Sequence, residues 1–232
     1  MDLFELGRVL HSAAGMVALA AFWVAALAGK GGHLHRRSGR VYLLALMGVM
    51  ALSSLMVAGR ALHGDPGAAI FLAFLISLVG TASWLMWFSS RLKRAEGRLH
   101  GIVYRGLASW LVAAGAGLLA LGIGRGAPLM MLLSSLGVAF GLNMWRLALA
   151  RHRGGRWWLA QHMNGAMLNF IATHDSFMAL GIGTVVPELR QPVPRMLIAA
   201  GVISAGILLR IAASRRFGGG PRRSASQLRR AS

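Results

Sequence analysis

Three histidines, His35, His100 and His162, each lie at the start of a long apolar segment, in HLHRRSGRVY, RLHGIVYRG and RWWLAQHMNG. If these segments are helices that run in the same direction, the three imidazoles share one depth. Three imidazoles at one level can ligate a transition metal, and two can bind a haem iron from its opposite faces. We therefore predict a site for haem b or a transition metal. The alternative is an interfacial belt, in which the histidines lie among lipid headgroups.

A second polar group lies within the apolar stretch 160–184, where His174 and Asp175 are adjacent. Helical periodicity places Asn164 on the same face as Asp175, and Asn169 on an adjoining strip. A charged Asp at the centre of a bilayer costs at least about 2.5–3.5 kcal/mol on insertion scales. The carboxyl group must therefore be protonated or paired. It serves either proton or ion movement, or a structural hydrogen bond to a neighbouring helix.

His11 is a fourth candidate cofactor ligand. It lies about one turn inside the first apolar segment. Its expected depth is shallower than that of His174, and it lies on the opposite side of the membrane from His35. A metal shared by His11 and His174 would therefore require tilted or broken helices.

The composition indicates a polytopic membrane protein. Hydrophobic residues make up 56% of the 232 residues, charged residues make up only 13%, and the mean hydropathy is +0.60. The sequence has no cysteine, which excludes disulfides and cysteine-ligated metals. The only lysines, Lys30 and Lys93, lie in polar segments, so no lysine is placed for a retinal Schiff base.

Seven apolar runs are long enough to cross a bilayer as helices. They cover roughly residues 8–28, 41–61, 67–89, 103–124, 127–148, 160–184 and 194–213. Prolines lie between the runs or at their first residues, and none interrupts a run, as expected of unbroken helices. We predict an all-α, seven-helix transmembrane bundle over residues 1–213, and a basic, disordered cytoplasmic tail over residues 214–232.

Basic residues are unevenly divided between the two sides of this topology. The tail and the connections on the side of His35 carry most of the 25 lysines and arginines. The other side has only Arg8, Arg60, Arg125, Arg190 and Arg195. The positive-inside rule then places the N-terminus outside and the C-terminus in the cytoplasm. The net charge of +19 is spread over short juxtamembrane segments, so the expected partner is anionic lipid of the inner leaflet and not nucleic acid.

The excess of arginine over lysine, together with abundant alanine and glycine, is typical of a bacterium with high genomic GC content. The expected location is therefore a bacterial inner membrane. Small residues four positions apart, such as Gly137 and Gly141 or Ala113 and Gly117, indicate close helix contacts. These contacts lie either within one bundle or between copies in a homo-oligomer.

Two stretches resemble a bacterial membrane-protein family known as domain of unknown function 2306. One contains Leu10-His11 and then the segment 35–42, HRRSGRVY, which is similar to the family pattern HRxxGRxY. The other contains Trp158 and His162, followed by Ile171-Ala172 and Phe177. The resemblance implies a helical membrane protein and favours His11, His35 and His162 as functional residues. His174-Asp175 departs from the pattern, and the resemblance implies no activity.

Three functional hypotheses follow. The leading one is a histidine-dependent haem- or metal-binding membrane protein with a redox or assembly role. The second is a small-solute or proton-coupled transporter that uses Asp175. The third is a structural partner in a membrane complex, which needs neither site.

Overall fold

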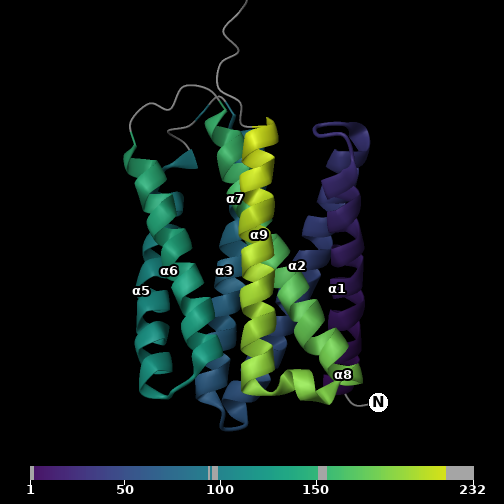
Figure 1. Ribbon diagram of the computed structural model, residues 1–232, viewed down its shortest axis with the longest axis vertical. Coiled ribbons are helices and arrows are strands. Elements are labelled where there is room, and N and C mark those ends of the chain that lie inside the picture. The colour runs from purple at the N-terminus through teal and green to yellow at the C-terminus, as the bar shows by residue number, and fades with distance from the viewer. Residues whose placement is uncertain (1–2, 94, 96–98, 151–155, 218–232) are drawn as a thin grey trace, which may run out of the picture.

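The computed structural model describes residues 3–93, 95, 99–150 and 156–217, and all regular secondary structure in these ranges is helical (Figure 1). Seven long helices follow one another: α1 (Leu3–Leu27), α2 (His33–Leu62), α3 (Pro66–Arg91), α5 (Ile102–Gly124), α6 (Pro128–Leu149), α7 (Trp157–Ser176) and α9 (Pro192–Phe217). The predicted all-α architecture is confirmed. The predicted tail from residue 218 onward lies outside the described residues.

Six of these helices, all except α7, are long and apolar enough to cross a membrane. Their outward surfaces are apolar: Leu55 is 71% exposed, Ile102 85% and Leu208 65%. A protein surrounded by water does not expose large aliphatic side chains over whole helices, but a protein surrounded by lipid does. The chain is a multi-pass membrane protein.

The two ends of the bundle differ in charge. We call the end that carries Lys30, Arg36, Arg37, Arg40, Arg91 and Arg105 the basic end. The opposite end carries the first turn of α1 and the α2–α3, α5–α6 and α7–α9 connections (Figure 1). Successive long helices therefore run in alternating directions, as predicted for a multi-span bundle.

Two helices extend beyond their predicted bounds. α2 begins at His33, so HLHRRSGR forms its first turns and not a polar connection. Gly31, with φ of 79°, forms the turn before it, a conformation that favours glycine. α9 ends at Phe217 and therefore includes Ser214, where the tail was predicted to begin. Hydropathy marks the bilayer-sized core of a helix and does not detect its polar end turns.

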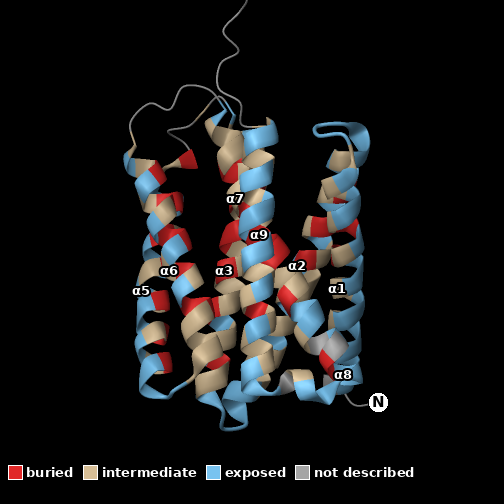
Figure 2. Ribbon diagram, in the orientation of Figure 1, coloured by how far each residue is buried: buried red, intermediate tan, exposed pale blue. Residues whose placement is uncertain are grey.

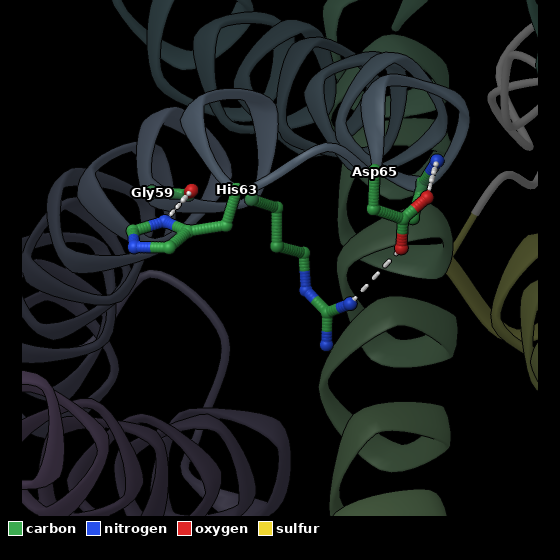
Figure 3. A network of polar contacts seen from close by, with 5 residues as sticks. Gly59, His63 and Asp65 are labelled. Atoms are coloured by element: carbon green, nitrogen blue, oxygen red, sulfur yellow. Dashed lines mark hydrogen bonds and ion pairs between the residues drawn. The ribbon is translucent and has the colours of Figure 1, made fainter.

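The α2–α3 connection shows how these helices end (Figure 3). His63 Nδ1 donates to the carbonyl of Gly59 at 2.6 Å, which satisfies a carbonyl at the end of α2. Asp65 accepts from the backbone N–H of Ala68 at 3.1 Å and so caps α3, whose first residue is proline. The Asp65 carboxylate also lies 3.4 Å from Arg60 Nη1.

The helices form two antiparallel pairs on either side of a central group. α1 packs on α2, α5 packs on α6, and α3, α7 and α9 lie between the two pairs (Figure 1). Buried residues face the inside of the bundle, and exposed residues cover the outer helix surfaces (Figure 2). After α7 the chain continues through a π-helix (Phe177–Ile182), α8 (Gly183–Val185) and a 3₁₀ turn (Pro187–Arg190).

Glycines allow the closest helix contacts. A Cβ on Gly165 of α7 would lie 2.5 Å from the carbonyl oxygen of Ala82 in α3. A Cβ on Gly137 would lie 2.5 Å from Phe74, and one on Gly141 would lie 2.8 Å from the carbonyl oxygen of Ala108. Gly137 and Gly141 are therefore used for packing within one bundle.

Candidate functional site

α7 is the central polar helix of the bundle. It packs on α3 and α9 and also contacts α1. Its buried residues include Gln161, Asn169 and Asp175, side chains that lipid would not solvate. The neighbouring helices supply the hydrogen-bond partners, so α7 does not need an apolar surface of its own. This explains why α7 alone among the long helices described here lacks the hydropathy of a spanning segment.

Asp175 is paired with a cation from α9. The Arg195 guanidinium donates to the two carboxylate oxygens at 2.7 and 2.6 Å. The exposed fractions of the two side chains are only 16% for Arg195 and 10% for Asp175. Of the two routes open to a buried carboxyl group, the structure uses pairing. The partner comes from a neighbouring helix, and the contact joins α7 to α9.

Asn164 also faces α9, as its helical phase relative to Asp175 predicts. Its Oδ1 accepts from Arg210 Nε at 2.8 Å, and Arg210 also donates to Ser214 Oγ and to the carbonyl of Ala160. The face shared by Asn164 and Asp175 is therefore the α9 contact. Asn164 is thus held by Arg210 across the contact between α7 and α9.

Asn169 lies on the adjoining strip and contacts α3. Its amide nitrogen donates to Ser83 Oγ at 3.2 Å. One turn further, Thr173 Oγ1 lies 3.2 Å from Tyr42 Oη of α2. The two polar strips of α7 thus face different neighbours, and both face the inside of the bundle.

His174 is directed away from Asp175. Its Nδ1 donates to the Phe170 carbonyl at 2.8 Å, and its Nε2 accepts from the indole N–H of Trp23 at 2.9 Å. Both ring nitrogens are therefore used by a neutral imidazole, which leaves neither for a metal. Trp23 is near the basic end of α1, whereas Arg195 is near the opposite end of α9. The pair His174-Asp175 lies between them, at neither surface.

His35 and His162 lie side by side near the basic end, with ring centres 6.4 Å apart. His35 Nδ1 donates to the carbonyl of Ala25, and His162 Nδ1 donates to the carbonyl of Met86, both at 2.9 Å. In the described part of the chain, no hydrogen bond reaches either Nε2. Two imidazoles from α2 and α7 are thus fixed in the tautomer that leaves Nε2 as the free acceptor.

The end of α1 helps to position His35. The Lys30 ammonium donates to the carbonyls of Ala25 and Ala26, the same turn that accepts from His35. These bonds satisfy carbonyls that the end of α1 leaves without a helical partner. Burial lowers the pKa of Lys30, and the nearby charge of Arg216 lowers it further.

His100 does not join this pair. Gln161 Nε2 lies 3.2 Å from His100 Nε2 and 2.9 Å from Tyr104 Oη, and the His100 ring also contacts Trp157. Gln161 and His162 are consecutive on α7 and so project about 100° apart. The described residues contain no group of three or more His, Cys, Asp or Glu side chains that could bind a metal ion.

His11 is also remote from the pair. It lies about 21 Å along α1 from Ala25, the residue that His35 contacts. Its Nδ1 is 3.3 Å from Ser53 Oγ of α2. Of the four histidines predicted as cofactor ligands, the structure brings together His35 and His162.

Comparisons with protein-family models, with curated proteins and with solved structures give no match. The resemblance to domain of unknown function 2306 therefore stays a prediction. His35 and His162, which that resemblance favours, are the pair described above.

Sequence reasoning missed the partners that α1 and α9 provide. Arg195 and Arg210 were counted only among the basic residues of the two sides, yet both direct their side chains into the bundle. An available signal was their position inside or beside an apolar run, where an arginine needs a partner. Trp23 carried no such signal, because a tryptophan in a membrane helix is ordinary.

Proposed function

We propose that this membrane protein binds a haem between His35 and His162 and uses it for electron transfer or in the assembly of a redox complex. The observation that supports this proposal is the imidazole pair itself. Both rings donate through Nδ1 to a main-chain carbonyl, the arrangement in which ligating histidines are commonly held. Each ring therefore presents Nε2 without a change of tautomer.

The separation of the rings suits one metal atom between them. Metal–nitrogen bonds of about 2.0–2.1 Å on both sides place the two ring centres roughly 6–6.5 Å apart. The ring centres of His35 and His162 are 6.4 Å apart. The two ring planes are inclined at 65°, so the rings are not stacked face to face.

The number of ligands favours haem over a metal ion bound by protein alone. Protein-bound zinc has three or four protein ligands, and the described residues contain no such group. A haem would need only two ligands from the protein, and His35 and His162 would be those two. When bound, it would supply one-electron redox chemistry.

The test is an absorption and EPR spectrum of the protein purified from haem-sufficient cells. We expect a Soret band and a low-spin signal that His35→Ala and His162→Ala each abolish or convert to high spin. His33→Ala is the matched control, because His33 is exposed and lies two residues from His35 on the same helix. A spectrum without a Soret band after haem reconstitution would end the proposal.

Orientation and location belong to the same proposal. The basic end faces the cytoplasm, the N-terminus lies outside, and the membrane is a bacterial inner membrane. The support is the concentration of arginine at one end of the bundle.

A small-solute or proton-coupled transporter is the second candidate. The observation that favours it is a nearly buried ion pair, Asp175 with Arg195, and the π-helix Phe177–Ile182 that begins two residues after Asp175. π-helical turns within helices are frequent at functional sites. In this reading the pair opens when a proton or an ionic solute replaces one partner. Its test is proton or solute flux in proteoliposomes, which should be abolished by the double variant Asp175→Asn/Arg195→Gln, because that variant leaves neither charge buried without its partner.

A further inference from the structure

Four cationic or titratable side chains line a surface cavity at the basic end. The described residues that line it are His33, Arg36, Arg37 and Arg40, and its volume is about 540 Å³. Their spacing along α2 places them on one face of its first two turns. All four are exposed, so the face is open to its surroundings.

No described acid neutralises this face. Glu5, Asp65 and Glu188 lie at the opposite end of the bundle, and Asp175 is paired with Arg195. In the described ranges, the three guanidinium groups of the cavity make no hydrogen bond or ion pair. Like charges at this spacing on a helix repel each other, so an anion bound among them stabilises the turn.

The start of α2 adds to the attraction of this cavity for an anion. Gly32, the residue before the helix, provides no side-chain cap, and the first backbone N–H groups point out of the helix end. A helix N-terminus favours negative charge, and Cβ atoms tilt the arginine side chains toward that same end. Lys30 is excluded from the cluster, because it donates to Ala25 and Ala26.

The surface next to the cavity is apolar. Leu34 is 57% exposed, Val41 43% and Leu44 68%, and all three belong to α2. A ligand with a phosphate group and acyl chains would match both parts of this surface. Soluble phosphate would use only the arginines.

We propose that His33, Arg36, Arg37 and Arg40 bind the headgroup of a phospholipid that carries two negative charges, with its acyl chains along α2. Guanidinium groups form paired hydrogen bonds to phosphate oxygens, which distinguishes a defined site from diffuse attraction to a charged leaflet. This site is independent of any cofactor at His35 and His162.

The test is native mass spectrometry of the full-length protein released from micelles that contain equal amounts of phosphatidic acid, phosphatidylglycerol and phosphatidylcholine. We expect wild type to retain phosphatidic acid over phosphatidylcholine. The variant Arg36→Gln/Arg37→Gln/Arg40→Gln should lower that ratio about 10-fold or more. The single variant Arg37→Gln should lower it by a smaller factor, and it provides the readout if the triple variant is unstable.

The matched control removes the same charge from the same end. Arg91, Arg105 and Arg215 are exposed arginines that do not line the cavity, and their triple Gln variant should keep the wild-type ratio. An equal fall of the lipid ratio in both triple variants would show diffuse attraction to the charged end and not a defined site, and would overturn the proposal. Inorganic phosphate in millimolar excess should leave the lipid bound. Displacement by phosphate would assign the cavity to a soluble anion instead.

Discussion

Arg195 and Asp175 are joined by two parallel hydrogen bonds of 2.7 and 2.6 Å, across the contact between α9 and α7. The residues are 20 apart in sequence, at the two ends of a π-helical and 3₁₀ connection. When two nearly buried charges are paired, a protein loses less stability if both are removed than if only one is removed.

Asp175→Asn should therefore destabilise the bundle, because it leaves the Arg195 charge without a counter-ion. Removal of one partner of a buried pair costs about 3–5 kcal/mol. Thermal unfolding of the purified protein in detergent measures this loss. The double variant Asp175→Asn/Arg195→Gln should recover much of it, and strictly additive losses would show that the two residues are not coupled.

Gly165→Ala should separate α7 from α3. The added Cβ would lie 2.5 Å from the Ala82 carbonyl and 2.9 Å from the Met86 amide nitrogen, both of them backbone atoms. We expect a loss of about 1–3 kcal/mol from overpacking, measured by thermal unfolding. Gly117→Ala is the control, since a Cβ there meets no atom within 4 Å. Equal stability of the two variants would contradict the close α3–α7 contact.

Trp23→Phe should destabilise the contact between α1 and α7. It removes the N–H that donates to His174 Nε2 at 2.9 Å and leaves that nitrogen without its donor. The expected cost is about 1–3 kcal/mol in unfolding free energy. Trp110→Phe is a suitable comparison, because its acceptor, Ser77 Oγ, also donates to a main-chain carbonyl. A Trp23→Phe variant as stable as wild type would argue against the contact.

Reporter fusions test the orientation. Fusions at residue 95 and after residue 215 should report cytoplasm, and fusions near residues 65 and 190 should report the outside, because arginine-rich ends stay in the cytoplasm. A cytoplasmic signal at residue 65 would show that the orientation is reversed or that the helices do not alternate across the membrane. A reporter at residue 30 should agree with the one at residue 95.

The helices could be predicted from the sequence because each one begins and ends at residues that can be recognised from their immediate neighbours. Pro66 and Pro128 begin α3 and α6, and the runs predicted over residues 67–89 and 127–148 match these two helices closely. The residues that share a face of α7 could also be predicted, because that depends only on their spacing along the helix. Asn164 and Asp175 share a face because of helix geometry, and both contact α9.

The partners could not be predicted in the same way. Which helix faces Asp175 depends on how seven helices pack, and no short sequence pattern encodes that arrangement. The same holds for the histidines. A shared depth for His35, His100 and His162 follows from topology, but only packing directs His100 toward Gln161 and leaves His35 beside His162.

The polarity of α7 has a consequence for biogenesis. Most of its polar side chains bond to α1, α2, α3 and α5, which leave the ribosome before α7 does. Asn164 and Asp175 are the exceptions. The partners of these two, Arg210 and Arg195, belong to α9 and are synthesised last. α7 should therefore wait at the translocon until α9 emerges, and the two should enter the lipid together as one helical hairpin. A chain truncated before residue 195 should leave α7 outside the bilayer and exposed to membrane proteases.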